Sequence, residues 1–196
     1  MEEVYLDRNL QLLIWEDIKK TRNFGKEKHE ILSEMLQCPL GYAWEILYAG
    51  RMPNSREIKR LSRAYFVEEL VLIHTDLLDS FYQGDYLREN VIFFLKSLRW
   101  GLQKELSVYT QVDKQTAYRW TKGLNLPKGD NLRRLIEFIN MEYGPNCCRN
   151  IKEEPYFLGP WPSSPMQKRG EIKNLIDGMD DFDFNAVYPA LLKLLK

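Results

Sequence analysis

QKELSVYTQVDKQTAYRWTKGLNLP, residues 103–127, is the stretch of this chain that decides its fold. It predicts a short helix, a tight link and a second helix, over residues 103–110, 111–113 and 114–122. Asp113 is a favourable N-cap for the second helix, because its side-chain oxygen can accept a free amide of the first turn. Gly123 suits the C′ position, because glycine adopts the left-handed conformation at little steric cost. The stretch therefore indicates two helices joined by a short turn.

The pattern of side chains gives these two helices an inner and an outer face. The residues expected to point inward are Leu106, Ser107, Thr110, Val112, Ala117 and Trp120. Among them, Ser107 and Ala117 are small enough to let the helices cross closely. The outer stripe of the second helix carries Lys114, Gln115, Tyr118 and Arg119, a spacing that places them on one helix face. Long donors on an exposed second helix are suited to reading base edges in the major groove.

Residues 91–140 resemble a helix-turn-helix domain of the lambda-repressor/Cro type, also called the xenobiotic-response-element type. The matching residues are Leu95, Leu98, Arg99, Gln103, Leu106, Ser107, Val112, Trp120, Gly123, Pro127, Leu132 and Leu135. The sequence departs from the family at Gln111, where the turn usually has glycine. Because a positive φ suits glutamine less well than glycine, this departure puts the turn geometry in question. The resemblance implies an all-α fold and a DNA-binding surface.

The function that the resemblance implies is that of a sequence-specific double-stranded DNA-binding transcriptional regulator, repressor-like. The expected DNA-binding residues are Gln103, Lys104, Lys114, Gln115, Thr116, Tyr118, Arg119 and Lys122. The family pattern implies that the first two meet phosphates. A glutamine can pair with adenine and an arginine or lysine with guanine, each worth about 1–3 kcal/mol of discrimination, so Lys114, Gln115 and Arg119 are expected to reach bases. Thr116 and Tyr118 would add apolar or phosphate contacts.

The distribution of charge agrees with this surface, although the net charge of the 196-residue chain is zero. Residues 86–143 carry ten Lys or Arg and six Asp or Glu. Residues 1–85 carry eleven against fifteen, and residues 144–196 carry seven of each. The positive balance falls on the segment with the motif, as attraction to phosphates requires. A chance fluctuation is the alternative interpretation.

A second, degenerate copy of the motif lies in residues 10–66, so we infer an internal duplication. Gly50, Pro53, Ile58 and Leu61 parallel Gly123, Pro127, Leu132 and Leu135, and Leu32-Ser33 parallels Leu106-Ser107. The second helix of this copy, residues 40–48, has Gly41, Tyr42 and Glu45 where the other copy has donors. We therefore expect a packing or dimerisation role. The basic residues Arg51, Arg56 and Lys59 are expected to make secondary phosphate contacts, with a solvated helix face as the alternative.

The remaining chain predicts an all-α protein of two tandem lambda-repressor-like helical domains. Further helices are expected over residues 6–21, 26–37, 55–66, 67–82 and from 86 or 88 to 100. From residue 144 the sequence becomes rich in proline and aromatics, which indicates an arm that packs against a surface. Short amphipathic helices are expected over residues 171–178 and 184–195. The expected divisions are 1–84, a degenerate domain with a bridging helix; 85–143, the DNA-binding domain; and 144–196, the arm and C-terminal helices.

Other function classes lack support in the sequence. The chain has no P-loop, no Rossmann glycine pattern, no nucleophile elbow and no HExxH, so we expect neither an enzyme nor a cofactor. Its three cysteines give neither a disulfide framework nor a metal spacing. No apolar run approaches the ~20 residues of a membrane span, and the first residues lack a signal-peptide pattern. We expect a cytoplasmic protein, associated with the nucleoid in a bacterium or a phage-infected cell.

Two partner hypotheses remain beside duplex DNA. A homodimer is expected, because such domains bind as pairs and the first copy lacks donors. The arm and the apolar C-terminal helices suggest a protein partner, so the alternative function is a protein-interaction adaptor that docks without DNA. RNA binding is a further option, but the sequence shows no aromatic stacking platform. A gel shift with random duplex at low salt separates the regulator from the adaptor.

Overall fold

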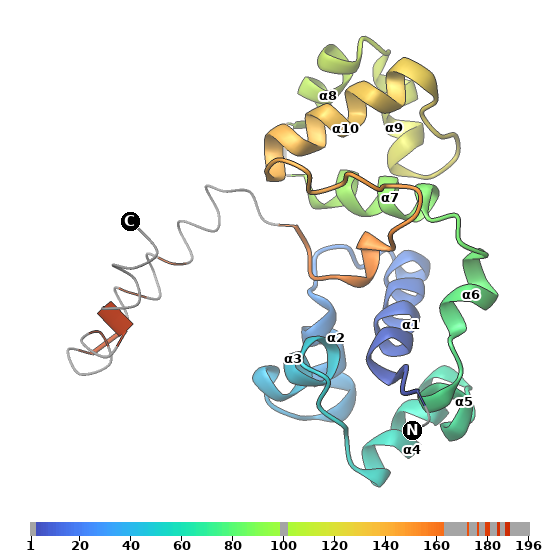
Figure 1. Cartoon of the computed structure of the whole chain (residues 1–196), viewed down its shortest axis with the longest axis vertical. Coiled ribbons are helices and arrows are strands. Elements are labelled where there is room, and N and C mark those ends of the chain that lie inside the picture. The colour runs from blue at the N-terminus through green and yellow to red at the C-terminus, as the bar shows by residue number, and fades with distance from the viewer. Residues whose placement is uncertain are drawn as a thin grey trace.

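A computed structural model describes residues 3–98 and 102–162, together with residues 172, 176, 179, 180, 184, 187 and 188. Within these residues the chain forms ten α-helices and one 3-10 turn and no strand (Figure 1). The all-α prediction is therefore confirmed. The amphipathic helices predicted over 171–178 and 184–195 lie outside the continuously described residues.

The chain has a first half, residues 3–84, and a second half, residues 85–162. The first half contains α1 (Leu6–Thr21), α2 (Lys28–Leu36), α3 (Leu40–Tyr48), α4 (Ser55–Tyr65), α5 (Glu69–His74) and α6 (Leu77–Tyr82). The second half contains α7 (Leu87–Ser97), α8 (Leu102–Thr110), α9 (Lys114–Thr121), α10 (Gly129–Tyr143) and the 3-10 turn η1 (Tyr156–Leu158). Helices α8 to α10 form one end of the molecule and α2 to α5 the other, with η1 between α1 and α7 (Figure 1).

One continuous core joins the two halves, and an aromatic cluster lies at its centre. The ring of Trp15 in α1 lies 5.8 Å from Phe93 of α7, 5.8 Å from Phe157 of η1 and 5.9 Å from Trp161, measured between ring centroids. Phe93 and Trp161 are stacked at 4.8 Å. The prediction that the arm's aromatics pack is confirmed, but the segment is inserted between the halves, and Phe157 is fully buried.

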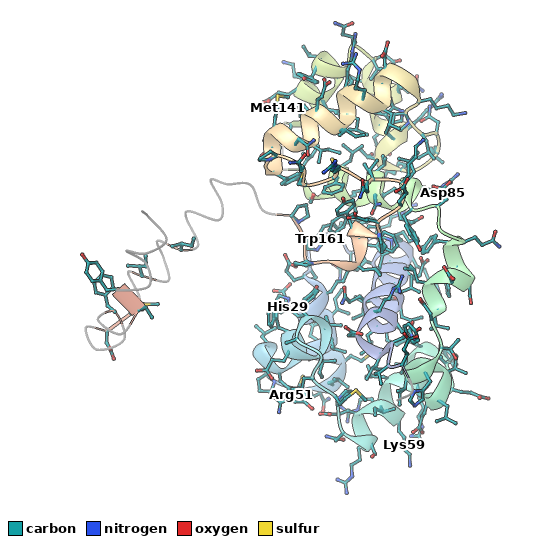
Figure 2. All side chains as sticks on the ribbon, in the orientation of Figure 1. His29, Arg51, Lys59, Asp85, Met141 and Trp161 are labelled. Carbon is teal, nitrogen blue, oxygen red and sulfur yellow. The ribbon has the colours of Figure 1, made fainter. Side chains whose placement is uncertain are left out.

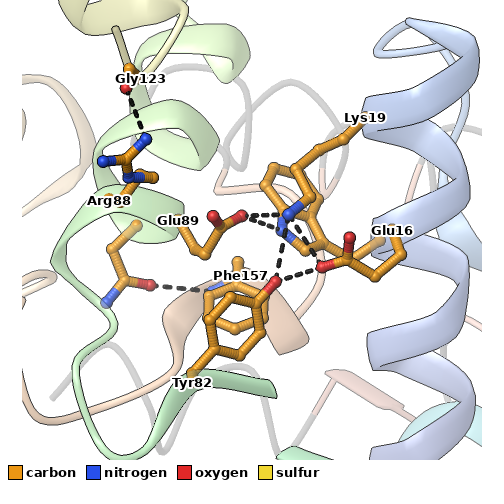
Figure 3. A network of polar contacts seen from close by, with 9 residues as sticks. Glu16, Lys19, Tyr82, Arg88, Glu89, Gly123 and Phe157 are labelled. Carbon is orange, nitrogen blue, oxygen red and sulfur yellow. Dashed lines mark hydrogen bonds and ion pairs between the residues drawn. The ribbon is translucent and has the colours of Figure 1, made fainter. Parts of the chain in front are cut away.

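A buried polar network also connects the halves (Figure 3). Glu89 of α7 accepts hydrogen bonds from the Trp15 indole at 2.8 Å and from the Lys19 ammonium at 2.6 Å. Lys19 also pairs with Glu16 at 2.8 Å and donates to the Tyr82 hydroxyl at 3.1 Å. Because Glu89 is buried, the loss of one partner would leave an uncompensated charge, which is strongly destabilising. The network therefore fixes α1 against α7.

The single helix predicted over residues 67–82 is wrong, because the segment divides into α5 and α6. The buried side chain of Asn9 in α1 causes the break: its amide donates to the carbonyls of Leu72 at 2.8 Å and Thr75 at 2.7 Å. Its oxygen accepts from the backbone amide of Leu77 at 3.1 Å. Asp76 then caps α6 by accepting from the amide of Leu78 at 3.0 Å. These bonds satisfy the backbone groups that a helix end leaves unpaired.

The second half repeats this arrangement around Asn90 of α7. Its amide donates to the carbonyls of Ile151 at 2.7 Å and Glu154 at 2.6 Å, and its oxygen accepts from the amide of Phe157 at 3.2 Å. The residue four positions earlier is a tyrosine in both halves. The backbone amide of Tyr5 donates to the Ile73 carbonyl at 2.7 Å, and that of Tyr86 donates to the Lys152 carbonyl at 3.0 Å. Ile73 and Lys152 each directly follow a residue whose carbonyl accepts from the asparagine. The repeated pattern thus extends to residue 157, beyond α10.

Candidate nucleic-acid interface

A tight turn joins α8 to α9, and Gln111 adopts the left-handed conformation within it, with φ 56°. The amide of Gln111 donates to the Val108 carbonyl at 3.2 Å, and the amide of Val112 donates to the Ser107 carbonyl at 3.1 Å. The turn therefore forms with glutamine where the resemblance expects glycine. A left-handed non-glycine residue costs roughly 1–2 kcal/mol, which the surrounding packing must offset.

The first half contains the same turn between α2 and α3. Gln37 has φ 55°, and the amide of Cys38 donates to the Ser33 carbonyl at 3.1 Å. Both halves thus place a glutamine in the left-handed region at this point.

The two ends of α9 are fixed as the sequence predicts. The Asp113 carboxylate accepts from the backbone amide of Thr116 at 2.8 Å and from its hydroxyl at 2.7 Å, and these bonds lower the pKa of Asp113. At the other end Gly123 has φ 64°, and the amide of Leu124 donates to the Arg119 carbonyl at 3.0 Å. A Cβ on Gly123 would lie 2.8 Å from the Ile92 side chain, so glycine is required for space as well as for φ.

The inner face of the α8–α9 unit is buried as predicted. The buried residues are Leu106, Ser107, Thr110, Ala117 and Trp120, while Val112 is half-buried. Trp120 is 1% exposed and holds α9 against the core. Since the helix is fixed through this face, its opposite face is forced outward.

The predicted outer stripe of α9 faces solvent. Lys114, Gln115, Tyr118 and Arg119 are all exposed, and Tyr118 is 54% exposed. Together with Lys104 of α8, Lys114 and Tyr118 line a shallow groove of about 290 Å³ between the two helices. Lys122 is exposed at the end of α9, and its ammonium lies 5.4 Å from the centroid of the Tyr118 ring. Hydrogen-bond donors from both helices thus meet on one surface.

Two of the eight predicted DNA-contact residues, Gln103 and Thr116, are not among these exposed donors. Gln103 belongs to α8, but its side chain lies outside the described residues. Thr116 is half-buried and its hydroxyl donates to Asp113, so its role in the structure is within the cap.

The predicted secondary phosphate contacts do not join this surface. Arg51 and Lys59 lie at the end of the molecule opposite α9 (Figure 2), and Arg56 belongs to α4 beside Lys59. Arg51 is ion-paired with Glu45, and its guanidinium carbon lies 4.3 Å from the centroid of the Tyr42 ring. One duplex lying on α9 would therefore not use this basic cluster.

Helix α3 follows the left-handed Gln37 as α9 follows the left-handed Gln111, and its surface has a different character. Leu40 and Trp44 are exposed, the latter by 46%, and the rings of Trp44 and Tyr48 lie 5.6 Å apart. Glu45 forms an ion pair with Arg51. As the sequence predicts, α3 offers few donors, and its exposed face is largely apolar.

Sequence reasoning missed two features of the fold. Lys96 of α7 and Arg22, which follows α1, join Lys122 at the edge of α9 and extend the basic surface. No local pattern predicts this meeting, because Arg22 is distant in sequence. The repeated asparagine did have a signal: residues 5–10 read YLDRNL and residues 86–91 read YLRENV.

Compared with models of known protein families, with curated proteins and with solved structures, the chain gives no match. In the described part of the chain, no group of three His, Cys, Asp or Glu side chains is placed to hold a metal ion. None of the described helices is long and apolar enough to cross a membrane. Cys38, Cys147 and Cys148 are thiols that form no disulfide with one another.

Proposed function

We propose that this chain is a sequence-specific double-stranded DNA-binding regulator that inserts α9 into the major groove. The observation that carries the proposal is the orientation of α9: Trp120 anchors one face in the core, and the opposite face presents Lys114, Gln115 and Arg119 to solvent. A helix held rigidly by its inner face can place donors accurately against base edges.

The surroundings of α9 supply the attraction that such binding requires. Lys104, Lys122 and Lys96 lie on or beside the helix, within the segment that carries the positive balance of the chain. Lysines at the margins of a groove-reading helix neutralise phosphates and make the affinity fall with salt. The bases would then be read by the three donors of the stripe.

The proposal includes a tandem origin and a homodimer. The shared left-handed glutamine and the shared asparagine pattern support two copies of one ancestral unit. Only the second copy presents long donors on its outer stripe, so recognition of a two-fold site needs two chains. Sedimentation of the protein alone and on duplex tests this: a monomer in both states refutes the homodimer.

Fluorescence anisotropy with a labelled selected duplex tests the DNA contact. Arg119→Ala is expected to remove the preference for the selected site over random duplex, and to leave the thermal unfolding midpoint unchanged because the side chain is exposed. Arg149→Ala, an exposed arginine beyond α10, is the control for loss of one positive charge. Equal loss of preference in both variants would contradict a specific role for α9.

A second candidate function is favoured by exposed apolar side chains at the other end of the molecule. Phe66 is 96% exposed, and Leu70 and Trp44 are exposed on neighbouring helices. Exposed apolar side chains are typical of a surface that contacts another protein where they form one contiguous patch. If the full chain fails to shift random duplex at low salt, the adaptor is favoured over the regulator.

A further inference from the structure

A pocket of about 420 Å³ lies where the C-terminal ends of α1, α7 and α9 meet. It borders the outward face of α9, because Tyr118 lines both this pocket and the groove between α8 and α9. The side chains that define it are Arg22, Phe24, Ile92, Lys96, Tyr118 and Lys122. Two halves of the chain therefore contribute to one cavity.

The charges in this pocket are not balanced by carboxylates. Lys19 on the rim is paired with Glu16 and Glu89. By contrast, Arg22, Lys96 and Lys122 form no ion pair with any residue in the described part of the chain. Burial lowers the pKa of Lys96, and the nearby positive charges of Lys122 and Arg22 lower it further. Three cations thus converge without an anion.

The partial negative charges at the three helix C-termini offset only part of this positive charge. A helix C-terminus carries roughly half a negative charge, so three converging ends supply about one and a half, against three cations. Burial lowers the pKa of Lys96 most, and repulsion from Lys122 and Arg22 adds to this effect. The arrangement is unfavourable for the fold alone, as binding sites frequently are.

The pocket also has an apolar wall. The Lys96 ammonium lies 4.6 Å from the centroid of the Phe24 ring, and Ile92 and Leu124 complete the lining. A volume of about 420 Å³ falls within the usual range for small-molecule sites. Arginine and lysine together suit a phosphate, because they supply a fork of donors and a point charge. A phosphate of the DNA backbone would use the cations but has no need of the apolar wall.

We propose that this pocket binds a small organic phosphate of about the size of a nucleoside monophosphate, with its phosphate on Arg22, Lys96 and Lys122 and its ring against Phe24 and Ile92. The pocket shares Lys96 and Lys122 with the proposed DNA contact, but the site needs no duplex to form, so its ligand can be tested without DNA.

Isothermal titration of the full chain without DNA tests the proposal, with adenosine monophosphate, inorganic phosphate and adenosine as probes. The monophosphate is expected to bind more tightly than inorganic phosphate, and adenosine is expected to give no binding. Lys96→Gln should weaken binding of the monophosphate at least tenfold, since it removes a charged donor. Its thermal midpoint should not fall, because the substitution relieves repulsion. Lys20→Gln, an exposed charge of α1 outside the pocket, is the matched control.

Three results would overturn the inference. The first is the absence of binding by both phosphates, and the second is equal binding of the monophosphate by wild type and Lys96→Gln. The third concerns the source of the phosphate: Lys96→Gln reduces the number of counterions released on duplex binding by about one, while no small phosphate binds. That outcome assigns the cations to the DNA backbone. Failure of the duplex to bind would refute the proposed regulator and leave the calorimetric result standing.

Discussion

Replacement of Asn90 by alanine should be among the most destabilising single substitutions in this protein. The buried side chain makes three hydrogen bonds to backbone groups, at 2.7 Å, 2.6 Å and 3.2 Å. A net loss of about 1 kcal/mol for each bond, with a further penalty for groups left buried without a partner, gives roughly 3–5 kcal/mol. Because small proteins are stable by only about 5–15 kcal/mol, the loss is a large fraction of the total.

Urea denaturation followed by tryptophan fluorescence measures this effect. Asn9→Ala removes the equivalent three bonds in the first half, so its loss should lie within about 1 kcal/mol of that of Asn90→Ala. Asn90→Asp keeps the oxygen that accepts from Phe157 but cannot donate to the two carbonyls, so it should not restore stability. Asn125→Ala, an exposed asparagine, is the control. A loss below about 1 kcal/mol in Asn9→Ala and Asn90→Ala would refute the reasoning.

Three further predictions concern stability. Lys28 is buried with its ammonium on the Gly159 carbonyl, and burial lowers its pKa to about 7, so the folded state binds fewer protons than the unfolded state between that value and 10.5. Unfolding free energy should therefore rise with pH in this window, by up to about 1.4 kcal/mol per unit, and Lys28→Met should flatten the rise in urea titrations at a series of pH values. Gly123→Ala should lower stability by at least about 1 kcal/mol in the same assay, because its φ is positive and Ile92 blocks the Cβ; an unchanged midpoint would contradict this. Asp113→Ala should remove about 1 kcal/mol through loss of the cap, whereas Asp113→Asn should retain most of it.

Local patterns were sufficient to predict most helices. The helical spacing of apolar residues predicts α1 over its full length. Asp113 and Gly123 mark the ends of α9, because helix caps depend on residues that are neighbours in the sequence. The orientation of α9 was predictable for the same reason, since small and large apolar residues on one face determine which side is buried.

Features that depend on distant contacts were not predictable from local patterns. The break between α5 and α6 is set by Asn9, which lies more than sixty residues earlier. The burial of Phe157 and the packing of Trp161 depend on an aromatic cluster assembled from three separate segments. Gln111 adopts a conformation that its own propensity disfavours, because the flanking helices determine the turn. The pocket around Lys96 likewise arises from tertiary packing alone.

The most direct test of the proposed DNA-reading surface is selection of bound sequences from a random duplex pool, carried out with the wild type and with a Lys114→Ala/Gln115→Ala/Arg119→Ala variant. The wild type should enrich one sequence and bind it at least about a thousandfold more tightly than random duplex. The triple variant should remain folded and show no enrichment. Enrichment of the same sequence by both proteins, or no duplex binding by the wild type at low salt, would contradict the proposed role of α9.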